Sequence, residues 1–354
     1  MTGPKVVVIG AGLVGASIAW HLARAGARVT VVEAGPPGGV ASGASWGWIN
    51  AGRGEDAAYG RLRVEAKREW RRLQRDLPGL PVAWPGSLAW ERPPGEFAAL
   101  AACLAAWSET VQLVAREEIG RRVPALAAPP DVALLVPDDG TVEPDATVLS
   151  LLAAAQSLDT QLNVGVAVHA LVLRGGRVTG VATGDGAIDA DHVVVAAGAG
   201  TAPLLSPIGL ALPVDDPPAL LVATRPLPPL IDGLLVTEAV EVRQRIDGRF
   251  LLAAGLERER DSATRAADAM RALAALLPAT AGADIERHVA GRRPIPADGH
   301  PIVGPVPGIE GLHVAVMHAG ATLAAAVGRF LGDEIITAKR SPLLARFGPC
   351  RFMR

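Results

Sequence analysis

The sequence predicts an α/β protein that contains a Rossmann-like nucleotide-binding domain, and three features near its N-terminus support this. An apolar run of strand length, residues 5–9, stops at Gly10. Gly12 and Gly15 follow at the spacing with which a strand turns sharply into a helix. A second apolar strand then ends in Glu33, eighteen residues after Gly15.

Each of these residues has a physical role in holding a dinucleotide. Gly10 permits the tight turn, Gly12 lets a pyrophosphate approach bare backbone, and Gly15 lets the helix pack closely on the strand. The helix N-terminus offers unpaired N–H groups and a partial positive charge. The Glu33 carboxylate can accept hydrogen bonds from ribose hydroxyls. An ordinary glycine-rich turn is the alternative, but two strands, a helix and a terminal acid in one unit favour the dinucleotide site.

The amino-acid composition limits which classes of protein this chain can belong to. The 354 residues are half apolar and 20% charged, which is enough for two domains or one large one. A net charge of −2 gives no reason to expect nucleic acid or an anionic membrane. Cys103 and Cys350 form neither metal-ligand spacing nor a disulfide framework, so no metal is expected and a reduced cytoplasmic setting fits best. We expect no membrane span, because polar residues or glycines interrupt every apolar run.

The rest of the chain alternates helical and strand patterns. Helices are predicted at residues 16–25, 59–76, 97–107, 110–118, 144–157, 262–277 and 321–339. Strands are predicted within 80–90 and at 134–137, 163–173, 177–183, 187–189, 193–197, 240–243, 250–254 and 312–316. The segment 193–197 is apolar throughout, which is typical of a strand buried on both faces of a parallel sheet.

A loop rich in small residues follows Glu33 and extends to about residue 50. Its hydroxyls, Ser42 and Ser45, can meet phosphate oxygens together with backbone amides. Trp46 and Trp48 stand out in a chain that is only 4% aromatic. They either fill core space or line a pocket beside a ring system.

Three further segments complete a recognisable pattern: Ala196-Ala197-Gly198-Ala199, the run from Arg293-Pro294 to Asp298-Gly299-His300-Pro301-Ile302-Val303-Gly304, and His318 to Leu323. With the opening unit and the 41–45 loop, they make the chain resemble the D-amino-acid oxidase/glycine oxidase superfamily of FAD-dependent amine oxidoreductases over nearly its full length. The resemblance implies a Rossmann-like FAD-binding domain from residues 1–80, 142–209 and 293–354. A discontinuous, mixed-sheet α+β substrate domain would take residues 81–141 and 210–292.

The resemblance also implies which residues meet the FAD. The diphosphate would lie against the opening turn, the ribose at Glu33, the adenine near Val168, and the flavin pyrimidine edge at the N-terminus of the last helix. Amide donors and a helix dipole there would stabilise the negative charge of reduced flavin. The implied cofactor-binding set is Gly10, Ala11, Gly12, Val14, Gly15, Glu33, Ala34, Ser42, Ser45, Val168, Gly198, Gly320, Ala321, Thr322 and Leu323.

For activity, the resemblance implies oxidation of the C–N bond of an amino acid or related amine to an imine, by hydride transfer to flavin N5. Such chemistry needs orientation of a C–H bond more than an acid or base, so no catalytic residue is assigned. Arg293 would bind a substrate carboxylate, or else form a structural ion pair. His318 would touch substrate or flavin, or else be structural. Trp46 and Trp48 complete the substrate-binding candidates.

The chain departs from some members of this superfamily in ways that bear on its cofactor and its electron acceptor. Gly291 and Trp46 stand near positions where others carry a tethering cysteine or histidine, so non-covalent FAD is expected. No lysine lies within residues 250–255, where sarcosine oxidases keep one that promotes reaction with oxygen. The expected electron acceptor is therefore either oxygen, as in an oxidase, or another molecule, as in a dehydrogenase.

Two other functions fit the same scaffold. One is a flavoenzyme that acts on a 2-hydroxy acid or a biosynthetic intermediate. The other is the FAD subunit of a multi-subunit dehydrogenase. In each case the partners are small molecules, and a homo-oligomer is possible.

Overall fold

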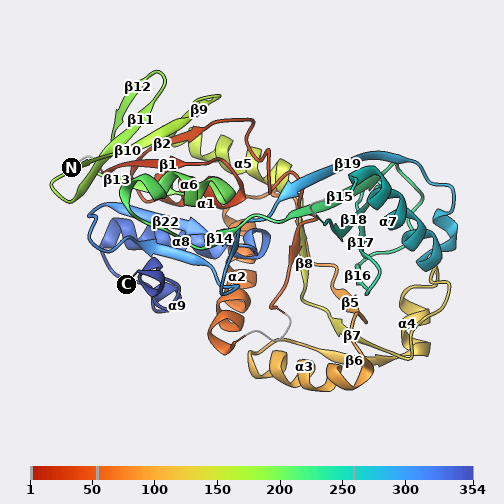
Figure 1. Cartoon of the computed structure of the whole chain (residues 1–354). Helices are drawn as coiled ribbons and strands as arrows, with labels where there is room; N and C mark the ends of the chain where they lie inside the picture. The colour runs from red at the N-terminus through yellow and green to blue at the C-terminus, as the bar shows by residue number, and fades with distance from the viewer. Residues whose placement is uncertain (1–2, 53–55, 258–259, 354) are drawn as a thin grey trace.

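The computed structural model describes residues 3–52, 56–257 and 260–353, which form two lobes joined by several crossings of the chain (Figure 1). The predicted domain segments 1–80, 210–292 and 293–354 include residues 1–2, 53–55, 258–259 and 354, which lie outside this description. The division into two domains stays a prediction. No helix in the described ranges is long and apolar enough to cross a membrane.

One lobe is built on a six-stranded sheet in the order β21-β22-β13-β1-β2-β9. All neighbours are parallel except β21 and β22, which run antiparallel. Its strands are β1 (Lys5–Ile9), β2 (Arg28–Glu33), β9 (Gln161–Val164), β13 (His192–Val195), β21 (Ile302–Pro305) and β22 (Leu312–Val316). This parallel sheet confirms the Rossmann-like fold class.

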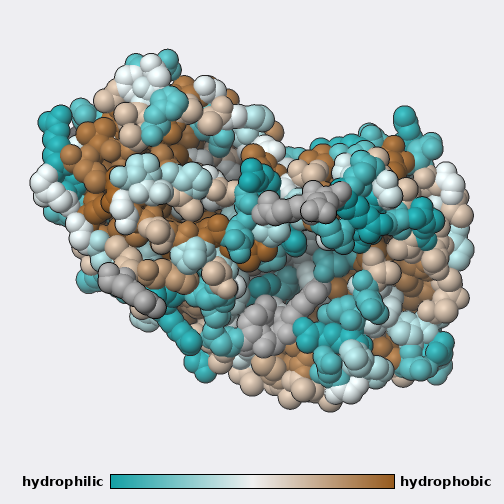
Figure 2. All heavy atoms as spheres, in the orientation of Figure 1, coloured by the Kyte–Doolittle hydropathy of each residue, from teal (hydrophilic) through white to brown (hydrophobic). Residues whose placement is uncertain are grey.

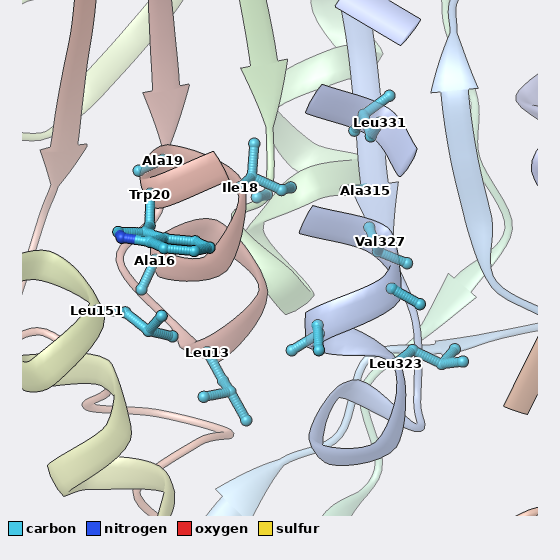
Figure 3. Close-up of a cluster of buried hydrophobic side chains, with 14 of the residues drawn as sticks. Leu13, Ala16, Ile18, Ala19, Trp20, Leu151, Ala315, Leu323, Val327 and Leu331 are labelled. Atoms are coloured by element: carbon cyan, nitrogen blue, oxygen red, sulfur yellow. The ribbon is translucent and has the colours of Figure 1, made fainter. Parts of the chain in front are cut away.

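Layers cover both faces of this sheet, which is why its central strands are apolar throughout. Val6 and Val8 of β1 face the helices, whereas Val7 and Ile9 face a three-stranded meander. The helices are α1 (Leu13–Arg24), α5 (Pro144–Gln156) and α8 (Gly320–Thr337), and the meander is β10 (Val168–Arg174), β11 (Arg177–Thr183) and β12 (Gly186–Asp189). Figure 3 shows α1 side chains such as Ile18 lying between Leu151 of α5 and Val327 of α8.

The other lobe is built on an eight-stranded mixed sheet in the order β19-β15-β18-β17-β16-β5-β7-β6. Helix α7 (Ser262–Leu276) packs on one face through Ala266, Ala269 and Leu273. The strands are β5 (Ser87–Ala89), β6 (Gln112–Ala115), β7 (Val132–Val136), β15 (Pro218–Thr224), β16 (Leu234–Val236), β17 (Glu241–Gln244), β18 (Phe250–Gly255) and β19 (Ile285–Arg292). The opposite face turns toward the nucleotide lobe, with Leu221 and Leu251 packed against Trp46.

Several elements connect the lobes. The long helix α2 (Ala57–Asp76) runs between them, beside a small sheet of β3 (Trp48–Ile49), β8 (Gly140–Val142) and β4 (Val82–Ala83). Strand β14 (Val214–Asp215) pairs with β20 (Ile295–Pro296), so this pairing and the small sheet both join segments that the prediction assigned to different domains. The remaining helices are α3 (Pro94–Ala106), α4 (Arg116–Arg122), α6 (Thr201–Leu205), α9 (Pro342–Ala345) and the short η1 (Gly198–Gly200), η2 (Ser206–Ile208), η3 (Pro278–Thr280) and η4 (Pro349–Phe352).

Most predicted elements are confirmed. The strand predicted at 163–173 is instead two strands, β9 and β10, which belong to different sheets. The helix predicted at 110–118 is wrong. Residues Gln112–Ala115 form the edge strand β6, and α4 begins only at Arg116. Strand β6 pairs with β7, and its Val114 side chain enters the core beneath the sheet. Pairing with a strand seventeen or more residues away outweighed the local helical pattern, because tertiary packing decides such short segments.

Two histidines, the buried His313 and the partly buried His21, predict that acid destabilises the fold. Burial lowers the pKa of His21 to about 4, although its ring N–H donates to the Ser17 carbonyl at 2.8 Å. Burial likewise lowers the pKa of His313 to about 3, beside His192 on the neighbouring strand. Both folded-state pKa values lie below the unfolded value of 6.5, so the unfolded chain takes up protons first as the pH falls.

Stability should therefore be full above about pH 6.5 and fall as the pH drops toward 4 and 3. At pH 5 the expected loss is about 2 kcal/mol for each histidine. Urea unfolding at pH 7 and pH 5 measures this loss. The His313→Gln variant should lose less stability between the two pH values than the parent chain, and an equal loss would contradict the assignment.

Candidate active site

A cavity of about 670 Å³ lies at the carboxyl ends of β1 and β2 and extends to the first turn of α8. Figure 2 shows the surface hollowed between the two lobes. Segments far apart in the sequence line this cavity. Those predicted as site residues are Gly10, Gly12, Val14, Glu33, Ala34, Ser42, Ser45, Val168, Gly198, His318, Gly320 and Ala321. The other predicted site residues, Ala11, Gly15, Arg293, Trp46, Trp48, Thr322 and Leu323, do not line it.

The opening turn has the geometry that its glycines predict. Gly10 has a φ of +103°, a conformation that side chains disfavour. A Cβ on Gly15 would lie 2.0 Å from the Gly10 carbonyl oxygen, so only glycine lets α1 approach β1 this closely. Gly12 caps α1 without a side-chain hydrogen bond, and the Leu13 amide donates to Ser42 Oγ at 3.0 Å. The helix end therefore presents backbone donors and a hydroxyl to the cavity, an arrangement that suits a diphosphate.

The Glu33 carboxylate is held in place by backbone amides. Its Oε2 accepts from the Ala11 amide at 2.7 Å and its Oε1 from the Gly35 amide at 2.8 Å. Ala11 thus acts on the cavity by orienting Glu33 and does not line the wall itself. An oriented carboxylate with further lone pairs can accept hydrogen bonds from ribose hydroxyls.

The first turn of α8 presents its backbone to the cavity and its larger side chains elsewhere. The Leu323 amide donates to the Ala319 carbonyl at 2.9 Å, and the Leu323 side chain is fully buried in the core. Thr322 Oγ1 bonds to β3 instead, donating to the Trp48 carbonyl and accepting from the Asn50 amide, both at 3.3 Å. The amides of Ala321 and Thr322 belong to the part of a helix that lacks intrahelical acceptors, so they are the donors this end can offer to a ligand.

Two charged residues that the sequence interpretation missed, Arg292 and Asp216, line the cavity wall. Arg292 pairs with Asp216, and both side chains border the cavity next to Pro294. Arg293, the predicted carboxylate ligand, does not line this cavity, and its Nε is buried without a hydrogen-bond partner among the described residues. No local signal separated Arg292 from Arg293, since the two adjacent arginines are chemically identical.

The two tryptophans lie between the lobes. Their rings are 5.5 Å apart, and Trp48 Nε1 donates to Asp139 at 3.0 Å. Trp46 packs against the inner face of the large sheet, and its carbonyl accepts from Arg243 Nε at 2.5 Å. Both therefore pack at the lobe interface, as the core-filling interpretation expects, and their role toward a substrate stays a prediction.

Known proteins of one family match this chain over nearly its whole length. The sequence matches the DAO family of FAD dependent oxidoreductases over residues 5–334. It is 32% identical to a glycine oxidase of Pseudomonas aeruginosa, covering 96% of each chain. A solved glycine oxidase from Geobacillus kaustophilus superposes with a TM-score of 0.87 at 25% identity, covering 98% of each chain. An iminodiacetate oxidase from Chelativorans sp. BNC1 gives a TM-score of 0.85 at 26% identity, covering 97% of this chain and 98% of that one.

The residues present fit an adenine dinucleotide with a ring system at its far end. The glycine turn has no room for a Cβ at Gly15, the Glu33 carboxylate is oriented from behind, and the cavity continues to the N-terminus of α8. The match to the family and the likeness to glycine oxidases confirm the superfamily, the fold class and FAD as predicted. The chain belongs to the DAO family of FAD dependent oxidoreductases and is an FAD-dependent enzyme.

Proposed function

We infer that this enzyme oxidises the C–N bond of an amino acid or related amine to an imine. The observation that carries this inference is the similarity to a glycine oxidase along 96% of the chain, with the FAD cavity built from matching segments. When bound, FAD supplies the hydride acceptor at N5. The similarity to glycine oxidases does not favour the two alternatives, oxidation of a 2-hydroxy acid and an FAD subunit of a larger dehydrogenase.

Within this proposal, the predicted residues take the following roles. The Gly10–Gly15 turn and Ser42 hold the diphosphate, Glu33 holds the ribose, and the Ala321 and Thr322 amides face the flavin pyrimidine edge. Arg293 binds the substrate carboxylate; its buried Nε, which has no hydrogen-bond partner among the described residues, supports this role, because a guanidinium fork is matched to a carboxylate. The protein then needs only to orient the α-carbon hydrogen, so no acid or base is assigned.

Anaerobic reduction of the bound flavin tests the reaction class directly. The purified holoenzyme is mixed with D- and L-amino acids, glycine, N-methyl amines and 2-hydroxy acids, and the visible absorbance of the flavin is followed. We expect bleaching by an amino acid or amine. Bleaching by hydroxy acids alone, or by none of the panel although dithionite bleaches the flavin, would refute amine oxidation.

We further expect the FAD to be non-covalent. Gly291 and Trp46 occupy the neighbourhoods where a tether would be needed, and neither Cys103 nor Cys350 lines the cavity. Acid precipitation should therefore release the yellow colour into the supernatant. Colour retained in the washed pellet would show a covalent bond.

We also propose oxygen or another electron acceptor, a cytoplasmic setting and a possible homo-oligomer. Two free cysteines support the reducing compartment. Oxygen consumption by the holoenzyme during turnover, compared with reduction of an artificial acceptor, distinguishes an oxidase from a dehydrogenase.

A further inference from the structure

A cluster of charged side chains is buried between α2 and the small sheet, and the proposed reaction does not use it. It consists of Lys67 on α2 with Asp139 and Glu109, whose side chains are only 1%, 3% and 5% exposed. Lys67 Nζ lies 3.2 Å from Asp139 Oδ1 and also pairs with Glu109. We call these three residues the Lys67 cluster.

Asp139 is the member with the most donors. Besides the bond from Lys67 to Oδ1, Asp139 Oδ2 accepts hydrogen bonds from Ser87 Oγ at 2.7 Å and from Trp48 Nε1 at 3.0 Å. A buried carboxylate is costly unless every lone pair is used, so three fixed donors lock its position. Burial raises the pKa of Asp139 while the Lys67 ammonium opposes the rise.

The contact with Trp48 connects this cluster to the FAD cavity. The Trp48 carbonyl accepts from Thr322 Oγ1 at 3.3 Å, and the Asn50 amide donates to the same hydroxyl at 3.3 Å. Strand β3 is thereby fastened to the first turn of α8, whose Gly320 and Ala321 line the cavity. Trp48 thus links Asp139, which bonds to its indole N–H, to the first turn of α8, which bonds to its backbone carbonyl.

We propose that Asp139 is a positioning residue: acting through Trp48, it fixes β3 against the first turn of α8 and so sets the reduction potential of the bound flavin. Amide donors and the positive end of the α8 dipole stabilise the negative charge that reduced flavin carries. Loosening that helix end weakens this stabilisation and disfavours reduction. The inference rests on the proposed placement of the flavin pyrimidine edge at α8.

The Trp48→Phe variant tests this, because it keeps an aromatic ring and removes only the indole N–H that reaches Asp139. The midpoint potential of the flavin is measured in holoenzyme by equilibration with a reference dye, without substrate. We expect a more negative potential, together with an about tenfold slower flavin reduction at saturating substrate and little change in KM. Trp84→Phe is the matched control. The Trp84 Nε1 donates to Gln74 Oε1 at a distance of 2.7 Å, and Trp84 does not line the cavity. Its potential should equal that of the parent enzyme.

Two further variants separate positioning from general stability. Asp139→Ala should lower the potential as Trp48→Phe does, and the double variant should show no larger shift than either alone. Glu109→Gln disturbs the same buried cluster without touching Trp48, so its potential should stay unchanged. If Asp139→Ala does not fold, the comparison of Trp48→Phe with Trp84→Phe still decides.

An unchanged or higher potential in Trp48→Phe overturns the proposal, as does an equal fall in Trp84→Phe. A rise in KM with an unchanged potential would mean that Trp48 touches the substrate directly. The potential needs no substrate, so these outcomes are independent of whether amines reduce the flavin. Failure of the substrate panel would therefore count against the proposed function alone.

Discussion

Replacing Gly15 with alanine should remove most of the bound FAD and destabilise the nucleotide lobe. The new Cβ would lie 2.0 Å from the Gly10 carbonyl oxygen, which is backbone and cannot turn aside. Helix α1 must then move away from β1, and its N-terminal amides move with it. Overpacking of this kind costs about 1–3 kcal/mol. The ratio of flavin to protein absorbance after gel filtration, and the urea unfolding midpoint, measure the two effects.

Gly95→Ala provides the control for this substitution. Gly95 also lies in a helix, α3, but an added Cβ there meets no atom of the described residues within 4 Å. That variant should keep its flavin and its stability. A Gly15→Ala enzyme that retains FAD as tightly as the parent would show that the close approach of α1 is dispensable.

Arg293→Ala should raise KM for carboxylate-bearing substrates about 30-fold or more, with a smaller effect on kcat. Removing one partner of a buried charge pair costs about 2–5 kcal/mol, and this range gives the lower bound on the change. This prediction is based on the buried Arg293 Nε, for which the described residues supply no hydrogen-bond acceptor. Steady-state kinetics with the best amino acid from the reduction panel measure the change.

Two comparisons make this prediction specific. The decarboxylated amine of the same substrate should be affected little, because it lacks the group that Arg293 would bind. Arg287 lies on β19, which ends just before Arg293, and its side chain is half exposed near Asp145, so Arg287→Ala should leave both KM values near those of the parent. Equal KM values for the parent and Arg293→Ala enzymes would remove Arg293 from the substrate pocket.

The nucleotide-binding unit could be read from local sequence because its requirements are local. The turn conformation of Gly10 and the missing Cβ of Gly15 depend on residues within one strand, one turn and one helix. The failed helix at 110–118 shows the opposite case. Its strand β6 exists because β7 offers a pairing edge and a core position for Val114, and neither is visible in the segment itself.

The residues of the candidate site also fall into two groups, those that local sequence predicts and those that tertiary packing decides. Residues that face the cavity with backbone or small side chains, such as Gly198 and Ala321, follow from the family pattern and line the wall. The charged residues do not follow, since the register of a strand decides which of its side chains reach the cavity. Register places Arg292, the last residue of β19, opposite Pro218 and within reach of Asp216, whereas Arg293 follows the end of the strand and does not line the cavity.

The sequence by itself determined the α/β class, the dinucleotide turn and, through the resemblance, the FAD chemistry, because glycine spacing and strand periodicity act over a few residues. Only the tertiary structure decided that Lys67 meets Asp139 and that Trp48 links Asp139 to α8. These contacts join positions many tens of residues apart, so they exist only after the sheets have packed and their strands have taken a register.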